Sequence, residues 1–293
     1  YVTANGLKSD VFKVSIREPF AEDAYETITY PVVFHLIQDK TKVELGQGVG
    51  ADIVNYAFNT IYNCFARTAA FSPNGADTKI RFRLAEYDPN GRKMEEKGIN
   101  RYSLSTSDLN NLNPEKIKNN PKICWDYKRY LNIWIVENMG NSVSTPHYIL
   151  NTADLNQIQG VSFEQLSLEE IEKQEYSLTD IGLIYGARDF AIEDVGYPTQ
   201  MGKFFGLLDT ENQKEDYCED TFAYNTYKEP WNTALEGSNS RLKISTDGLI
   251  FYSVNIMDAS SYKNTISMDQ VKRIRTITDN CPHRWAWKSD WAF

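Results

Sequence analysis

The chain has 293 residues, a length sufficient for one large domain or two smaller ones that share a cleft. Its formal net charge is −9 at pH 7. It contains no run of Lys and Arg that could follow a phosphate backbone, and this argues against a nucleic-acid partner. No stretch approaches the roughly 20 apolar residues that a membrane-spanning helix needs, so we expect a protein that does not span a membrane.

The first half of the chain predicts two strands and a helix. Residues 1–27 are polar and mixed, and we interpret them as a lead-in segment. Residues 30–37 (YPVVFHLI) are β-branched and aromatic, as in a buried strand. Residues 52–70 place apolar side chains at helical spacing and predict an amphipathic helix. Residues 79–87 alternate apolar and charged side chains, which is typical of a half-exposed strand.

The second half predicts shorter elements and a long loop. The elements are a buried strand at 130–136, an acidic surface helix at 163–175, a short strand at 181–185 and a short apolar helix at 201–208. About sixty polar and aromatic residues follow with little periodicity, and a loop of that length is unusual unless it is functional. Residues 268–278 predict a closing helix with Ser267 as its N-cap, and we expect the Trp-rich tail to dock on the body.

Four cysteines are widely spaced along the chain: Cys64, Cys124, Cys218 and Cys281. They show no CxxC spacing, which argues against a zinc finger. The even number is compatible with two disulfides in an oxidising compartment, with three possible connectivities. Composition alone leaves four buried free thiols equally open.

The only histidines are His35, His147 and His283. His35 lies on the first predicted strand, where a structural role is favoured. The other two occupy predicted loop or tail positions. Because nothing in their spacing indicates that the three converge, a zinc site built from them is disfavoured.

Residues 199–209 (TQMGKFFGLLD) have the outline of a zinc-protease motif without its chemical groups. The motif HExxHxxGxxH places two His one helical turn apart, a Glu general base between them, and a Gly that turns the chain toward a third His. Gly202 and Gly206 keep the scaffold positions. The four chemical positions hold Thr199, Gln200, Lys203 and Asp209.

With this segment, several others resemble the pappalysin-like metzincin family in the same order and with matching spacing. They are residues 30–37, residues 59–68 (NTIYNCFART), residues 80–101, residues 130–135 (YLNIWI), residues 219–221 (EDT), residues 255–258 (NIMD) and residues 268–275. The resemblance covers about residues 28–284. It implies a secreted, periplasmic or cell-surface protein, such as a lipoprotein, whose signal segment is not part of this chain.

The resemblance implies an α/β (α+β) fold of the metzincin-like zincin type, with a mixed, mostly parallel sheet flanked by helices. Residues 28–209 would form the upper subdomain, and residues 210–293 an irregular lower subdomain that ends in a helix. Met257 would lie in a Met-turn beneath the helix of the motif. Within these halves we expect the disulfides Cys64–Cys124 and Cys218–Cys281.

The resemblance also indicates which chemistry is missing. In the family a Tyr usually sits two residues after the Met of the Met-turn, and Ala259 holds that position here. All three zinc ligands, the general base and this Tyr are therefore changed together, so we expect no zinc and no peptidase activity. Lys203 and Asp209 could form an ion pair where the metal would sit, or both could point into solvent.

Acidic residues are concentrated after the motif: Asp209, Glu211, Glu215, Asp216, Glu219 and Asp220. A hard cation such as Ca²⁺ takes several oxygen ligands from one loop. A calcium loop formed by Asp209, Glu215, Asp216, Glu219 and Asp220 is one hypothesis, and a plain acidic surface loop is the other.

Three functions follow from these interpretations. The first is an inactive protease fold kept for binding or regulating a peptide or protein. The second is an active secreted hydrolase with an unconventional site, although no GxSxG motif is present and few His are available as bases. The third is a structural or adhesive surface module that does not use the cleft.

Overall fold

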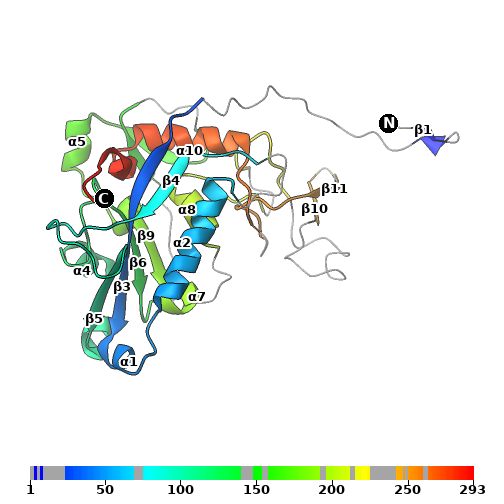
Figure 1. Ribbon diagram of the computed structural model, residues 1–293. Helices are drawn as coiled ribbons and strands as arrows, with labels where there is room; N and C mark the ends of the chain where they lie inside the picture. The colour runs from blue at the N-terminus through cyan, green and yellow to red at the C-terminus, as the bar shows by residue number, and fades with distance from the viewer. Residues whose placement is uncertain are drawn as a thin grey trace.

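Five parallel strands form the central sheet (Figure 1), in the order β4-β3-β6-β9 with β5 also paired to β3. The strands are β3 (Ile28–Asp39), β4 (Ile80–Leu84), β5 (Ile99–Leu104), β6 (Leu131–Val136) and β9 (Gly182–Gly186). The mostly parallel sheet flanked by helices that we predicted is confirmed.

The remaining elements are short, apart from three helices. They are β1 (Thr3–Ala4), β2 (Leu7–Lys8), α1 (Lys40–Glu44), α2 (Ala51–Phe65), α3 (Thr106–Asn110), α4 (Pro114–Lys118), β7 (Tyr148–Asn151), β8 (Ser162–Gln165), α5 (Leu168–Lys173), α6 (Leu178–Ile181), α7 (Ala187–Ala191), α8 (Tyr197–Phe204), β10 (Leu242–Ile244), β11 (Ile250–Tyr252), α10 (Met268–Asn280) and the 3₁₀ helix η2 (Pro282–Lys288). The computed structural model describes residues 3–4, 7–8, 24–68, 75–139, 148–153, 158–191, 196–211, 215–224, 242–246, 248, 250–259 and 263–293.

β3 is the central strand because it pairs along both edges. One edge meets β4 and then β5, and the other edge meets β6. Nearly every residue of β3 is buried, as expected for a parallel strand covered on both faces. Pro31 lies one residue before Val32, where the pairing with β6 begins, so its missing N–H does not interrupt that ladder.

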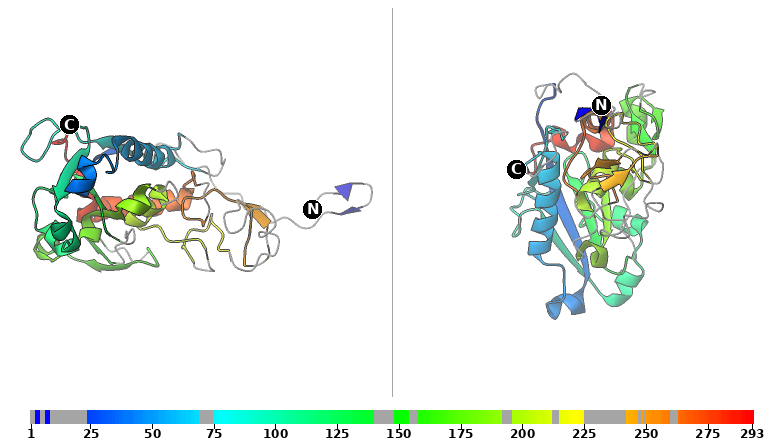
Figure 2. Two further views of the ribbon diagram at one scale, coloured as in Figure 1. Left: turned by 90° about the horizontal axis from the view of Figure 1, so that it is seen from below. Right: turned by 90° about the vertical axis from the view of Figure 1, so that its right-hand side faces the viewer.

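Helices cover both faces of the sheet (Figures 1 and 2). On one face, α2, α8 and α10 share a core cluster with β3, β4 and β9, and α8 lies beside α2 and α10. On the other face, α3, α4 and α6 pack on Trp134 and Val136 of β6. The first cluster includes side chains from both sides of residue 209, so the predicted halves share one core, and the division between them stays a prediction.

The C-terminal tail docks on the body as predicted. Ala292 is fully buried, and its carbonyl accepts a hydrogen bond of 2.8 Å from the backbone N–H of Glu86. The Arg129 guanidinium lies 3.9 Å from the centre of the Trp291 ring. Trp287 packs against the main core. These contacts join the end of the chain to the sheet.

The structure differs from the predicted secondary structure in three places. Residues 163–175 are not one helix: β8 occupies the first part, and α5 begins only after Ser167, whose side chain forms a capping box with Glu170. The predicted helix at 201–208 is α8, which starts earlier, at Tyr197, and ends at Phe204. The segment between β4 and β6 contains β5, α3 and α4, for which we predicted no elements.

The predicted disulfides Cys64–Cys124 and Cys218–Cys281 are wrong, because all four cysteines are free thiols. Cys64 belongs to the cluster on the α2 face of the sheet, whereas Cys124 packs with the cluster on the opposite face. Cys281 packs beside Ile149 and Ile277. Cys218 instead places its Sγ 3.6 Å from the carbonyl oxygen of Asp216. The partners of each predicted pair therefore have different neighbours.

The free thiols lead to a simple prediction. In the unfolded protein, four thiols per chain should react with Ellman's reagent without any reductant. Native protein should react slowly, because burial raises the pKa of Cys64 to about 12 and of Cys124 to about 11, and only the thiolate is nucleophilic. A count of two or fewer thiols in the unfolded protein would show that disulfides form after all.

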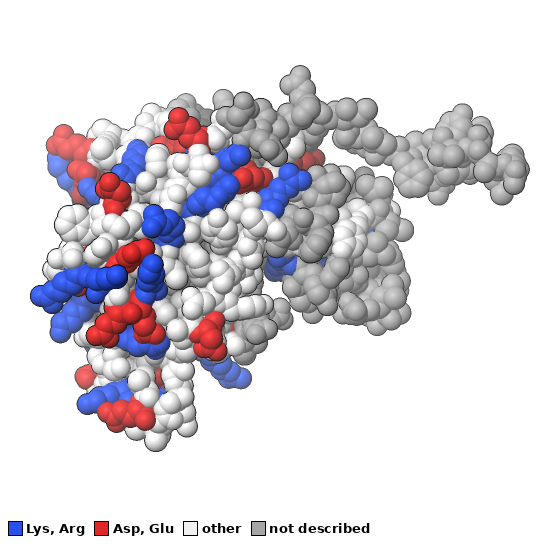
Figure 3. Space-filling model, viewed as in Figure 1, with Lys and Arg blue, Asp and Glu red and all other residues white. Residues whose placement is uncertain are grey.

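Charges of both signs are interspersed over the face in Figure 3, without a continuous basic track. Within the described ranges, no helix is long and apolar enough to cross a membrane.

Candidate functional site

The degenerate motif lies on α8 and on the turn that follows it. Gly196 precedes the helix with φ +62°, and Pro198 stands in its first turn, where the missing N–H costs nothing. Thr199, Gln200 and Lys203 follow at positions i, i+1 and i+4, which places Thr199 and Lys203 on one face. Thr199 is buried, while Gln200 and Lys203 are half-buried.

Gly206 ends this segment for two separate reasons. Its φ of +84° lies in the left-handed region. A Cβ at this position would also come within 2.0 Å of Cδ1 of Ile277 on α10. The backbone N–H of Leu207 returns to the carbonyl of Gly202 at 2.9 Å, which closes the turn.

Two buried arginines hold the carbonyls at the end of α8. Arg273 donates from Nε to the Gly206 carbonyl at 2.6 Å, and Arg284 donates from Nε to the Phe204 carbonyl at 2.9 Å. The Arg284 guanidinium also stacks 3.8 Å from the centre of the Phe204 ring. Cationic donors at a helix C-terminus satisfy its last carbonyls and favour its dipole. The backbone that would deliver a third zinc ligand is therefore fixed.

The predicted ion pair between Lys203 and Asp209 is confirmed. The ammonium Nζ lies 2.8 Å from Oδ1 and 2.9 Å from Oδ2 of the carboxylate. The two side chains are 22% and 29% exposed, so the pair is partly screened by solvent and adds only modest stability. The main effect of the pair is that the positive charge of Lys203 and the negative charge of Asp209 balance each other beside α8.

A second lysine that the sequence did not single out lies at the same face of α8. Lys263 donates from Nζ to Oγ1 of Thr199 at 3.2 Å, and Thr199 in turn donates to the Ile256 carbonyl. Burial lowers the pKa of Lys263, and the carboxylates of Asp258, Asp209 and Glu211 oppose that shift. No spacing or motif marks Lys263, because its role depends on the fold that returns the chain to Thr199.

Met257 lies in a tight turn against α8, as predicted. The side-chain Oδ1 of Asn255 accepts from the Met257 N–H at 2.9 Å, and the Asn255 carbonyl accepts from the Asp258 N–H at 3.1 Å. The Met257 Sδ lies 3.1 Å from where a Cβ on Gly202 would be, so this glycine allows the close approach. Asn255 and Gln270 exchange amide hydrogen bonds of 2.8 and 3.1 Å, which anchor the turn to α10.

Ala259, the residue that follows this turn, has no side-chain hydroxyl, but the hydroxyl of a tyrosine from another segment lies close to its backbone. The Ala259 N–H donates to the Tyr224 hydroxyl at 2.7 Å. Lys243 donates to the Ala259 carbonyl at 3.3 Å, and its Nζ lies 4.6 Å from the centre of the Tyr224 ring. Burial raises the pKa of Tyr224, so the phenol stays protonated. Sequence reasoning missed Tyr224 because it precedes the turn by more than thirty residues.

The acidic residues of the calcium hypothesis have separate partners. Asp209 pairs with Lys203, Asp216 accepts from the hydroxyl of Thr221 at 2.6 Å, and Asp220 accepts from Ser267 at 2.6 Å. Glu215 and Glu219 are exposed. Over the described residues, no three His, Cys, Asp or Glu side chains form a group that could hold a metal ion.

His35 and His283, the two histidines that the structure describes, have different neighbours. His35 is fully buried: Nε2 lies 2.8 Å from Oδ1 of Asn132, and burial lowers the pKa of His35 to about 4. This supports its structural role. His283 packs edge-on against Tyr127 at 5.1 Å. His147 lies outside the described residues.

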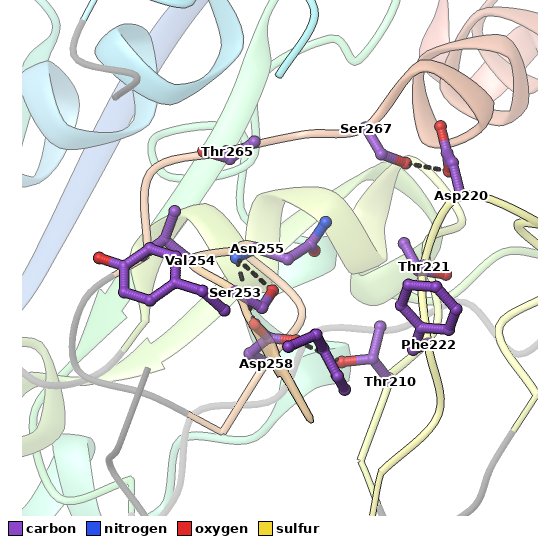
Figure 4. A pocket seen from close by; sticks show the side chains of 12 residues that line it. Thr210, Asp220, Thr221, Phe222, Ser253, Val254, Asn255, Asp258, Thr265 and Ser267 are labelled. Carbon is purple, nitrogen blue, oxygen red and sulfur yellow. Dashed lines mark hydrogen bonds between the residues drawn. The ribbon is translucent and has the colours of Figure 1, made fainter. Parts of the chain in front are cut away.

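A pocket of about 150 Å³ lies beside the turn at Met257 (Figure 4). Its polar side includes Asp258, which is buried and accepts from Thr210 at 2.7 Å. Burial raises the pKa of Asp258, and hydrogen bonds from Ser253 and Thr210 oppose the shift. Its rim includes the exposed aromatic side chains of Phe222 and Tyr252. The volume is below that of a typical small-molecule pocket, so it suits a single side chain better than a whole ligand.

The sequence matches no family profile and no curated protein. Solved structures of one protein, however, share the fold. Tannerella forsythia mature mirolysin in complex with a cleaved peptide superposes with a TM-score of 0.56 and 19% identity, over 90% of this chain and 96% of that one. A promirolysin variant from the same organism gives 0.55 and 20% identity, over 92% and 86% of the two chains. Mirolysin in complex with a small compound gives 0.53 and 17%, over 90% and 96%.

Proposed function

We propose that this chain is a catalytically inactive member of the mirolysin-like fold that binds a peptide segment of a partner protein beside α8. The observation that carries the proposal is the Lys203–Asp209 ion pair at 2.8 Å, together with the Lys263–Thr199 hydrogen bond at 3.2 Å. These four side chains use their polar groups on one another at the face where the fold would present zinc ligands.

The residues present do not fit a zinc ion. Zinc sites in proteins use His, Cys and carboxylate ligands, and Asp209 is the only such group among the four motif positions. Lys203 would have to lose a proton and give up its ion pair with Asp209 to become a ligand. Lys263 adds another ammonium group beside Thr199. Two ammonium groups repel a divalent cation.

The residues also lack a general base in the expected place. Gln200 is a neutral amide and cannot accept a proton from water at ordinary pH. Tyr224 does supply a hydroxyl beside Ala259, but that oxygen already accepts from the Ala259 N–H. The chain therefore keeps the backbone of the site and lacks both means of activating water.

Peptide binding is supported by the fold and by the pocket. The solved mirolysin complex holds a cleaved peptide. In this chain the pocket of about 150 Å³ beside Met257 offers a polar side and the exposed aromatic side chains of Phe222 and Tyr252. Aromatic side chains at a rim provide contact area for a peptide. A secreted or cell-surface location stays a prediction, and the four free thiols lend it no support.

The test combines metal analysis with a peptide library. Purified protein loaded with zinc and then dialysed should retain well under one zinc per chain, and it should cleave no peptide with or without a chelator. Immobilised protein should enrich a subset of the peptides, and Phe222→Ser with Tyr252→Ser should reduce that enrichment severalfold. Tyr56→Ser, which removes an exposed aromatic from α2, is the matched control. Stoichiometric zinc or chelator-sensitive cleavage would refute inactivity, and absence of enrichment would refute peptide binding.

A further inference from the structure

A second cavity, of about 490 Å³, opens where β3, β6 and β9 end. It lies at the end of the sheet that carries α1 and α7, whereas α10 crosses the opposite end (Figure 1). Ligands of parallel α/β sheets commonly bind beyond the carboxyl ends of the strands. The volume is within the range of small-molecule sites. None of the degenerate motif positions lines this cavity, so it is separate from the site beside α8.

The floor of this cavity includes one polar side chain, that of Gln38. Gln38, near the end of β3, is only 3% exposed, and its side-chain amide makes no hydrogen bond to any described residue. The amide lies against the backbone of Gly48, where an added Cβ would come within 3.0 Å of Nε2. The amide atoms are not among the fully enclosed polar atoms that lack a partner, so the amide is open to the cavity and can exchange hydrogen bonds with a ligand there.

Among the charged residues at the rim of the cavity, one cationic side chain has no ion pair with a described carboxylate. Lys42 pairs with Glu137, which also accepts from the Asp39 N–H at 2.8 Å. Arg188 is exposed on α7, and no described carboxylate forms an ion pair with it. Its planar guanidinium is well suited to a carboxylate, which it can bind through two parallel hydrogen bonds.

The wall between these two polar points is apolar. Val49 contributes from just before α2, Ile53 from its first turn, Met139 from the chain after β6, and Ala187 from α7. Apolar walls with a few placed polar groups are typical of small-molecule sites, where the polar groups fix the orientation of the ligand.

We propose that this cavity binds a small-molecule carboxylate with a short apolar body and an amide group. The carboxylate is held by Arg188, the apolar body lies along Val49 and Ile53, and the amide exchanges hydrogen bonds with Gln38. This proposal does not depend on the function proposed for the site beside α8.

N-acetyl-leucine is a suitable probe because it combines a carboxylate, an isobutyl group and an amide. For a ligand with roughly 12 non-hydrogen atoms, we expect a Kd of the order of a millimolar. Binding can be followed by saturation-transfer NMR and by titration calorimetry on the full chain. N-acetyl-leucinamide, which lacks the charge, should bind at least about fivefold more weakly.

Two substitutions test the assignment of the polar contacts. Arg188→Gln should weaken N-acetyl-leucine about fivefold and remove the preference over the amide, while Gln38→Met, which keeps the side-chain length, should weaken both probes by a similar factor. Arg92→Gln removes an exposed arginine elsewhere and should change nothing. Gly48→Ala is a second test of the floor, since its methyl group would press on the Gln38 amide.

The proposal fails if the unmodified protein does not bind N-acetyl-leucine at 20-fold the expected Kd. It also fails if Arg188→Gln and Gln38→Met, with unfolding curves like that of the unmodified protein, bind the probe as before. Should Gln38→Met not fold, Arg188→Gln and Gly48→Ala decide the outcome by the same measure.

Discussion

Restoring the zinc ligands should create a zinc site that binds more tightly once Lys263 is also removed. The fourfold variant Thr199→His, Gln200→Glu, Lys203→His and Asp209→His supplies three imidazoles and a carboxylate on a backbone already held at its end by Arg273 and Arg284. The Lys263 ammonium, however, lies 3.2 Å from the Thr199 hydroxyl. A cation so close to the first His should oppose a divalent metal strongly.

We therefore expect adding Lys263→Ala to the fourfold variant to tighten zinc binding at least about tenfold. Titration calorimetry at pH 7.5 measures the difference. The affinity should fall below about pH 6.5, because protonated His does not bind metal. Peptidase activity should stay low, since Ala259 still provides no hydroxyl. The control adds Lys272→Ala, which removes an exposed lysine from α10, and should leave the affinity unchanged.

Equal zinc affinity with and without Lys263 would contradict this account of the site. Tight zinc binding by the unmodified chain would contradict it further, because the ion pair of Lys203 would then not prevent metal binding.

Gly206→Ala should destabilise the protein by about 2–5 kcal/mol. The left-handed backbone costs a residue with a Cβ about 1–2 kcal/mol, and overpacking of a core adds about 1–3 kcal/mol. Ile277, whose Cδ1 the new methyl group would meet at 2.0 Å, is only 1% exposed. Urea unfolding followed by tryptophan fluorescence gives the change in midpoint at constant slope.

Gly248 provides a matched control for the backbone part of this cost. Its φ of +86° is nearly the same as the +84° of Gly206, but an added Cβ would meet no atom within 4 Å. Gly248→Ala should therefore cost only about 1–2 kcal/mol. In an Ile277→Val background, which removes the clashing Cδ1, Gly206→Ala should cost about as little. Equal losses for the two glycine substitutions in the unmodified background would show that α10 does not press on this turn.

The two clusters of side chains have different consequences for function. Beside α8, Lys203 forms an ion pair with Asp209, and Lys263 donates to the Thr199 hydroxyl. At the carboxyl end of the sheet, Gln38 and Arg188 have no such partner among the described residues. The polar side chains beside α8 are therefore occupied by one another, while the polar groups lining the cavity at the carboxyl ends of the strands are the ones that our second proposal assigns to a ligand.

The sequence by itself determined the elements whose signal is local. The apolar run at residues 30–37 is typical of a parallel strand buried on both faces, and β3 is that strand. Ser267 and Gln270 form the capping box that starts α10. The spacing of Lys203 and Asp209 around Gly206 made their ion pair one of two expected arrangements, and the structure shows the pair because a helix followed by a left-handed turn brings these positions together.

Only the tertiary structure decided which distant groups meet. Lys263 and Tyr224 reach the site from segments whose sequence shows no periodicity. Cys64 and Cys124 pack in clusters on opposite faces of the sheet, which the sequence does not reveal. Gln38 is one polar residue at the end of an apolar strand, and its lack of a partner follows from what packs around it. Local sequence patterns reflect backbone preference and the side that is buried. Contacts between distant segments depend instead on how the whole chain packs, so they cannot be predicted from the sequence of any one segment.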